Sequence, residues 1–177
     1  MRFISVFSGL LASLVLAGCV SAPARQLVLE SSQVVHHGEN AGSCNDENVV
    51  RNMQSEEIAE SHGLDPENIS VLNWNIYKGQ REDWAADFRR YIRDHDVVTM
   101  QEAHLDDDLR SMLGREHSYW VLNTAFNYQG KTTAVMTASR VQPVYSCGQH
   151  TAEPLIRLPK TSLVSYYPVA GMHEDLL

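Results

Sequence analysis

The sequence has no surplus of positive charge. Its 177 residues carry 14 Lys and Arg against 22 Asp and Glu, which gives a formal net charge of −8. A protein that binds nucleic acid by a broad basic surface needs clustered Lys and Arg, so this balance argues against that class. It leaves open a nuclease in which a bound cation supplies positive charge locally.

The sequence also lacks an apolar run long enough to cross a bilayer, which takes about 20 residues. The longest run, residues 3–16, is interrupted by serine and glycine and follows a single arginine. This pattern is typical of a signal peptide. The residues that follow, Leu-Ala-Gly-Cys19, resemble the cleavage box of bacterial lipoproteins. An ordinary secreted protein cut near Ala22 or Ala24 is the alternative.

The lipoprotein resemblance implies cleavage before Cys19 and lipidation of that residue, with 1–18 as signal peptide. Several acyl chains would give a stable membrane anchor. Val20 follows the cysteine, which resembles the outer-membrane pattern of Gram-negative lipoproteins. We therefore expect a protein of the bacterial cell envelope, lipid-anchored to the outer membrane and facing the periplasm.

Cysteine is scarce, with three residues in the chain. If Cys19 is lipidated, Cys44 and Cys147 are the only pair left, in a compartment where disulfides persist. A bridge between them would close a loop of about 100 residues and contribute up to about 4.7 kcal/mol in the chain-entropy model. Two thiols whose geometry forbids bonding are the alternative.

The rest of the chain is organised around residues 69–102, which are predicted to form a strand, a helix and a second strand. The two strands, 69–76 and 96–102, are rich in β-branched and apolar residues. Between them, large apolar residues recur at helical spacing: Trp84, Phe88, Tyr91 and Ile92. A right-handed crossover makes the strands parallel, so both end at one edge of the sheet. Asn75 and Glu102 are therefore expected to converge there.

The flanking segments complete an α/β pattern without internal repeats. Residues 19–68 are rich in Ser, Gly, Asn and Gln and predict a leader or tether, with a short strand at 26–29 and a polar helix at 47–62. Beyond Glu102 the periodicity predicts one more helix and further strands. The expected helix covers 104–114, and the expected strands cover 119–122, 132–137, 141–147, 161–167 and the start of one at 176–177.

Four segments together resemble the endonuclease/exonuclease/phosphatase superfamily. Residues 72–76 (LNWNI) and 97–102 (VVTMQE) are similar to its opening strands, and 133–140 (TAVMTASR) to its hairpin strand ending in Ser-Arg. Residues 160–168 (KTSLVSYYP) resemble a little-characterised bacterial branch. The resemblance covers 69–177 and implies the N-terminal half of a two-sheet α/β sandwich of the deoxyribonuclease I type, a mixed sheet with flanking helices.

The resemblance implies roles for two residues. Glu102 would ligate a divalent cation, Mg²⁺ or Mn²⁺, and Asn75 would lie beside it, in contact with the metal or the scissile phosphate. Mg²⁺ prefers a carboxylate with water and substrate oxygens, and it polarises a phosphoryl group. Taken singly, Glu102 also fits a solvated carboxylate at a strand end, and Asn75 fits a turn residue bonded to its own backbone.

The superfamily's second half brings Asn-x-His, Gly-Asp-x-Asn and a closing Asp-His, and none of these follows Glu102. That half supplies the general base that activates water. We expect this chain to be the N-terminal part of a longer phosphoester hydrolase, C-terminally truncated, incomplete and inactive by itself. The alternative is a non-catalytic lipoprotein that uses the half-fold as a binding or structural module.

The expected partners are a phosphoester substrate and the membrane that holds the anchor. Nucleic acid, a phospholipid headgroup and a small phosphate ester all suit such a site, and the sequence does not choose among them. No stable protein partner is expected.

Overall fold

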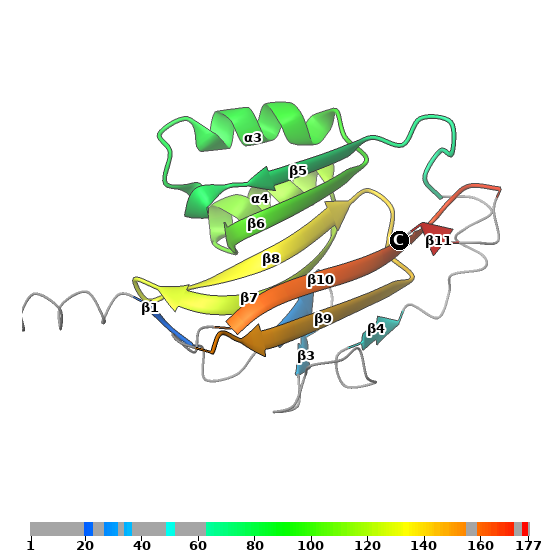
Figure 1. Cartoon of the computed structure of the whole chain (residues 1–177). Helices are drawn as coiled ribbons and strands as arrows, with labels where there is room; N and C mark the ends of the chain where they lie inside the picture. The colour runs from blue at the N-terminus through cyan, green and yellow to red at the C-terminus, as the bar shows by residue number, and fades with distance from the viewer. Residues whose placement is uncertain are drawn as a thin grey trace, which may run out of the picture.

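The computed structural model describes residues 20–22, 27–31, 63–154 and 159–171, together with the backbone of 34–36, 49–51 and 175–176. Within these residues two α-helices and one short 3₁₀ turn accompany two β-sheets (Figure 1). The helices are α3 (Trp84–Arg93) and α4 (Asp107–Glu116), and the turn is η2 (Tyr77–Gly79). The strands are β1 (Val20–Ser21), β2 (Leu27–Glu30), β3 (Val34–His36), β4 (Val49–Arg51), β5 (Val71–Asn75), β6 (Val97–His104), β7 (Tyr119–Tyr128), β8 (Lys131–Ser139), β9 (Tyr145–Ala152), β10 (Pro159–Pro168) and β11 (Asp175–Leu176).

The larger sheet is mixed and has seven strands in the order β3-β2-β7-β8-β6-β5, with β1 added beside β7. β5 and β6 run parallel, from Val71 opposite Val97 to Asn75 opposite Gln101, and α3 connects them. The predicted strand–helix–strand unit and its parallel pairing are therefore confirmed. β8 lies antiparallel to β6, so the start of β8 meets the end of β6.

Both helices cover one face of this sheet and share one apolar core. Side chains at alternate positions of the strands point into it, as period-two alternation requires. Trp74 of β5 packs on Phe88 and Tyr91 of α3, with ring centroids 6.2 and 5.9 Å apart. The buried core consists of Ile76, Phe88, Ile92, Val98, Met100, Ala103, Leu109, Met112, Leu113, Trp120, Leu122, Ala134, Met136 and Ala138.

The second sheet, in the order β11-β10-β9-β4, packs on the opposite face over β7 and β8. The layer between the sheets holds a small apolar cluster of Val28, Val121 and Leu163 and a buried polar side chain, Asn123, which donates to the carbonyls of Gln149 and Ser162 at 3.0 and 2.9 Å. The sheets approach closely at Gly148, where a Cβ would stand 2.6 Å from Val28 and 2.8 Å from Asn123. The arrangement is consistent with the expected partial two-sheet α/β sandwich.

Several expectations outside this core need correction. Val49–Arg51, inside the predicted helix 47–62, forms β4, because its two β-branched valines pair with Cys147 and Ser146 of β9; residues 52–62 lie outside the described part. The predicted strand 141–147 begins later, at Tyr145. Helix α4 begins at Asp107, where Asp106 accepts from the Leu109 N–H at 2.9 Å as its N-cap.

The signal segment 1–18, Cys19 and Cys44 all lie outside the described residues. Cys147 is fully buried in β9 and disulfide-bonded. The Cys44–Cys147 pairing and the lipidation of Cys19 stay predictions. Within the described part of the chain, no helix is both long and apolar enough to cross a membrane.

Candidate functional site

A β-bulge near the end of β6 turns Glu102 out of the helix-covered face. Met100 pairs with Met136 and Ala103 with Ala134, so two residues of β6 oppose one residue of β8. Strict alternation from Val98 and Met100 would send the side chain of residue 102 into the helix core. Because of the bulge, Ala103 instead points into the helix core, and the Glu102 side chain lies on the same face as that of Asn75.

Asn75 and Glu102 meet at the carboxyl ends of β5 and β6. The Asn75 amide donates from Nδ2 to Glu102 Oε1 at 3.1 Å, while its Oδ1 accepts from the Tyr77 N–H at 2.9 Å. The ammonium of Lys78 binds the other oxygen, Oε2. The predicted convergence is therefore present, and a third group, a lysine that the sequence did not single out, completes it.

The backbone around this contact is held in an unusual conformation. Tyr77, Lys78 and Glu102 have φ of 49°, 59° and 52°, in the left-handed region that L-residues seldom adopt. Gly79, with φ of 68°, ends the turn, and a Cβ there would stand 2.8 Å from the Trp84 ring. Such conformations cluster at functional sites, where the surrounding structure maintains them. Here they aim Lys78 and Glu102 at each other.

The pKa of Glu102 is held below its usual range, chiefly by the hydrogen bond from Lys78, against the effect of partial burial. The Asn75 amide lowers it further. Lys78 is itself only 10% exposed and lies between two rings, with Nζ 4.8 Å from the Tyr77 centroid and 5.0 Å from that of Tyr128. Glu102 is thus an ionised carboxylate at neutral pH, with a 31% exposed side chain.

A polar cavity of about 350 Å³ adjoins the Lys78 side chain. The β7–β8 hairpin forms one wall, and the start of α4 and the turn after β5 form the others. His104 lines it and is buried, with no hydrogen-bond partner for its Nε2 among the described residues. Burial, together with Lys131 and Lys78, lowers the pKa of His104. The lining residues are Lys78, Gly79, Gln80, Trp84, His104, Asp106, Asp108, Tyr128, Gln129 and Lys131.

The residues at the site offer hard oxygen ligands for a divalent cation, though few of them. Among the described residues there is no group of three or more His, Cys, Asp or Glu side chains placed to hold a metal ion. Mg²⁺ is commonly bound by one or two carboxylates, with water and substrate oxygens completing the shell. The Glu102 carboxylate with the Asn75 amide oxygen fits that sparse donor set, since each oxygen has a lone pair beyond its present hydrogen bond.

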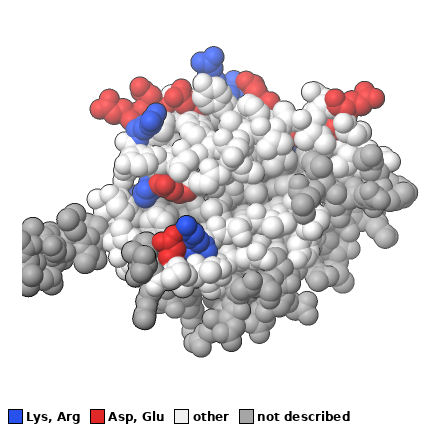
Figure 2. All heavy atoms as spheres, viewed as in Figure 1, with Lys and Arg blue, Asp and Glu red and all other residues white. Residues whose placement is uncertain are grey.

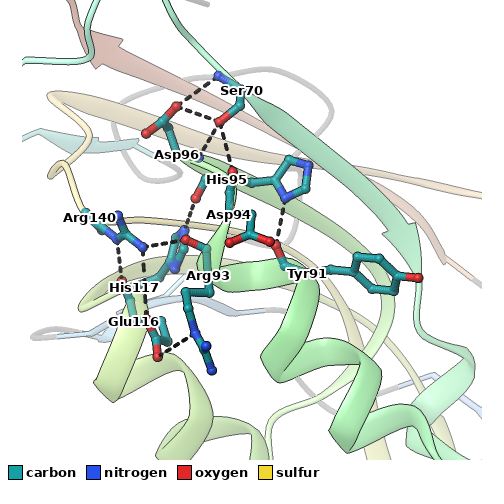
Figure 3. A network of polar contacts seen from close by, with 9 residues as sticks. All are labelled: Ser70, Tyr91, Arg93, Asp94, His95, Asp96, Glu116, His117 and Arg140. Carbon is teal, nitrogen blue, oxygen red and sulfur yellow. Dashed lines mark hydrogen bonds and ion pairs between the residues drawn. The ribbon is translucent and has the colours of Figure 1, made fainter.

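A second polar network lies at the opposite end of β6 (Figure 3). Arg140 donates to the Arg93 carbonyl at 2.7 Å and to the Glu116 carbonyl at 3.2 Å, and so joins the C-terminal ends of α3 and α4. His117, fully buried, binds the His95 carbonyl through Nε2 at 2.8 Å. The Ser-Arg pair ending β8 therefore has a structural role here, far from Glu102 along the strands.

The sequence missed Lys78, His104 and Tyr128 as parts of this site. A signal for Lys78 was present, since Gly79 directly after it marks a turn with positive φ at the end of a strand. Nothing in the sequence pointed to Tyr128, because it reaches the site across the sheet from the β7–β8 hairpin.

Comparison with known proteins gives a family match over the part of the chain that contains these residues. A family model described as the Endonuclease/Exonuclease/phosphatase family matches residues 72–171, which is 100 of the 177 residues. The match includes β5, β6, the hairpin and most of the second sheet. Nuclease- and phosphatase-like hydrolases of this family act on phosphoesters such as nucleic acids and are generally dependent on divalent metals.

A UPF0294 protein of Vibrio campbellii is 29% identical over 161 residues, 89% of this chain and 54% of that protein. The chain therefore spans about half the length of this curated relative. This similarity is consistent with a little-characterised branch of the family. No solved structure matches the chain.

Proposed function

Because the chain belongs to the endonuclease/exonuclease/phosphatase family, we propose that Glu102 and Asn75 form part of the active site of a divalent-metal-dependent phosphoester hydrolase. The observation that carries the proposal is the Asn75–Glu102 contact of 3.1 Å, made by a bulge and by left-handed backbone at Glu102. A solvated carboxylate at a strand end needs neither of these features.

Each residue has a definite task in this proposal. Glu102 supplies an ionised carboxylate oxygen as cation ligand, and Asn75 orients it through Nδ2 while its own oxygen fixes the Tyr77 turn. Bound Mg²⁺ or Mn²⁺ would supply Lewis-acid polarisation of the phosphoryl group. Lys78 is placed to balance negative charge beside Glu102. The motifs expected to carry the general base do not occur in this chain.

We also propose that the protein works in the bacterial envelope, lipid-anchored through Cys19 and facing the periplasm. Support comes from the sequence: an apolar segment too short to span a bilayer, followed by Leu-Ala-Gly-Cys19. Labelling with a fatty-acid analogue in a bacterial host tests this part, and incorporation that survives Cys19→Ser would contradict it.

Cation binding by the full chain tests the site. Titration with Mn²⁺, followed by electron paramagnetic resonance, and competition by Mg²⁺ should show one site that Glu102→Ala weakens about a hundredfold or more, since removal even of a residue that only orients a ligand costs 10- to 100-fold. Glu153→Ala is the matched control, because Glu153 also pairs with a lysine, Lys160, but lies directly after β9 in the second sheet. Equal binding by both variants would refute the site.

We expect the 177-residue chain to bind the cation without substantial turnover of a phosphodiester such as bis(p-nitrophenyl) phosphate, because the motifs expected to carry the general base do not occur in it. Turnover with Mg²⁺ that disappears in Glu102→Ala would overturn that expectation. It would also show that this chain holds a complete catalytic set.

A further inference from the structure

We propose that the substrate of this site is a lipid phosphoester, with its hydrocarbon held in an apolar cavity beside the Lys78–Glu102 pair. The inference rests on the proposed hydrolase function and narrows its substrate class. Three observations carry it: an aliphatic cavity with a cationic rim, its shared walls with the polar cavity at Lys78, and the course of the N-terminal strand.

The apolar cavity has a volume of about 360 Å³ and lies between β2, β7, β8 and the start of α4. Its walls are largely aliphatic, and among the described lining residues there is no Phe, Tyr or Trp ring on which a nucleobase could stack; the imidazole of His104 lies where this cavity meets the polar one. Two cations, Arg110 and Lys131, border it, and the one acid, Asp106, is engaged as the N-cap of α4. The apolar lining consists of Leu27, Leu29, Leu105, Leu122 and Ala134.

This cavity adjoins the polar cavity that Lys78 lines. His104, Asp106 and Lys131 line both it and the polar cavity, whose far wall is Lys78, the residue that binds Glu102. An amphiphile with its chain against the leucines would place an anionic headgroup near Lys131, with the phosphoester directed toward Lys78. Lys131 at the edge of the apolar cavity and the proposed metal site at Glu102 both favour a phosphorylated headgroup between them.

The N-terminal strand β1 also lies next to a residue of the polar cavity. β1 pairs with β7, with Val20 opposite Tyr128. Tyr128 lines the polar cavity, and its ring centroid is 5.0 Å from Lys78 Nζ. Cys19, the proposed lipid attachment point, directly precedes Val20 in the sequence. An anchor there would hold the mouth of the site close to the membrane that contains such substrates.

Charge argues against a polynucleotide as the occupant. The chain carries a net charge of −8, and on the described part of the face in Figure 2 Lys and Arg lie singly or beside acids, with no extended basic patch. A polynucleotide groove needs a continuous basic track along the backbone.

Binding measured by calorimetry tests the substrate class without requiring turnover. The full chain carrying Cys19→Ser, so that no attached lipid contributes, is titrated with monomeric dihexanoylphosphatidic acid, with glycerol 3-phosphate and with a 12-nucleotide single-stranded DNA. Each buried methylene tightens binding roughly fourfold, so the lipid should bind at least about tenfold tighter than glycerol 3-phosphate and tighter than the DNA.

Variants assign the affinity to this cavity. Leu29→Asn, or Leu105→Ser if the first does not fold by circular dichroism, should abolish the difference between the lipid and glycerol 3-phosphate. Leu163→Asn, a half-buried leucine on β10, should keep it. Lys131→Ala should weaken both phosphates about tenfold, and the exposed Lys160→Ala neither. Equal affinity for lipid and glycerol 3-phosphate, tighter DNA binding, or loss of the difference in Leu163→Asn would each overturn the proposal.

Parallel Mn²⁺ titration separates this inference from the proposed function. Lipid binding that depends on chain length, without a cation site sensitive to Glu102→Ala, would leave a lipid-binding protein and remove the hydrolase. A Glu102-dependent cation site without that chain-length dependence would keep the hydrolase and remove the lipid substrate.

Discussion

The two ends of β6 each carry a carboxylate whose pKa lies below its usual range, yet they are built in opposite ways. At the start, Asp96 accepts from the Ser70 hydroxyl at 2.7 Å and the Ser70 N–H at 2.9 Å. Burial would raise the pKa of Asp96, but these hydrogen bonds, together with the nearby Arg140 and His117, hold it below its usual range. At the far end, Glu102 is held by Lys78 and Asn75 on left-handed backbone.

The difference separates a structural carboxylate from the one that we propose as a cation ligand. The groups around Asp96 are mostly backbone and hydroxyl donors, and none of the residues drawn in Figure 3 has a positive φ. The groups around Glu102 are side chains that a cation or phosphoester can displace, on a backbone that costs free energy to maintain. A low carboxylate pKa alone therefore does not support the proposed site, since both ends have one; the exchangeable partners and the strained backbone at Glu102 do.

The largest expected effect comes from removing the structural carboxylate. Asp96→Ala leaves the Ser70 N–H and hydroxyl without their acceptor, and we expect a loss of about 3 kcal/mol in the free energy of unfolding. Urea denaturation of the full chain measures it. Glu102→Ala should cost less than about 1 kcal/mol, because that side chain is partly solvated. Similar losses in both variants would erase the distinction between the two ends.

Arg140 provides the next test. Arg140→Ala removes donors from the last carbonyls of α3 and α4, and we expect about 2 kcal/mol of destabilisation. Because Arg140 lies at the structural end, Mn²⁺ affinity of the folded protein should not change. Urea denaturation and the cation titration are compared in the same preparation, with Arg110→Ala as an arginine control outside the network. A change in Mn²⁺ affinity in Arg140→Ala would show that the two ends are coupled.

Glycine substitution reveals the strain directly. At Glu102, with φ of 52°, glycine adopts the native backbone more readily than alanine, so Glu102→Gly should be about 1 kcal/mol more stable than Glu102→Ala. At Asp96 the order should reverse, since glycine only adds freedom to the unfolded chain there. The urea denaturation midpoints of the glycine and alanine variants, compared at each position, measure both differences in stability. Glycine below alanine at Glu102 would mean that its backbone stores no strain.

The smallest expected effect is a pH dependence from the structural end. Burial lowers the pKa of His117, and the His95 carbonyl, which binds its ring, only partly opposes this. The unfolded chain then binds more protons, so this contribution is complete above about pH 6.5 and is lost as pH falls through the folded pKa. His117→Gln keeps a donor for the His95 carbonyl and should show a shallower decline of the urea midpoint between pH 7 and 5. An unchanged decline would assign the proton uptake to other groups.

The broad plan of the fold could be predicted because it depends on period and topology. Apolar alternation defined β5 and β6, helical spacing defined α3, and the right-handed crossover brought Asn75 and Glu102 to one edge. The bulge could not be predicted, since Gln101 and Glu102 are ordinary residues whose conformation is imposed by the pairing with β8. The role of Arg140 likewise depends on two helix ends distant in sequence.

The leader shows the same limit. Composition predicted a tether over residues 19–68, yet Leu27 and Leu29 of β2 form a wall of the apolar cavity. The β-propensity of residues 26–29 predicted a short strand there. The place of that strand beside β7 depends on tertiary pairing, which propensity does not predict. A segment of four residues thus joins the described sheet and shapes the cavity next to the site.

Because of the bulge in β6, the direction of the Glu102 side chain depends on the number of residues in that strand as well as on their types. Deleting Ala103 would let β6 and β8 pair without interruption, and Glu102 would take the place opposite Ala134. The carboxylate, although still present in the sequence, would then turn toward the helices. Both residues of the proposed site, Asn75 and Glu102, would then be retained, yet they would no longer meet. A scan of single-residue deletions along β6 would therefore separate the effect of which face a side chain points to from the effect of which residue it is. Substitutions alone cannot do this.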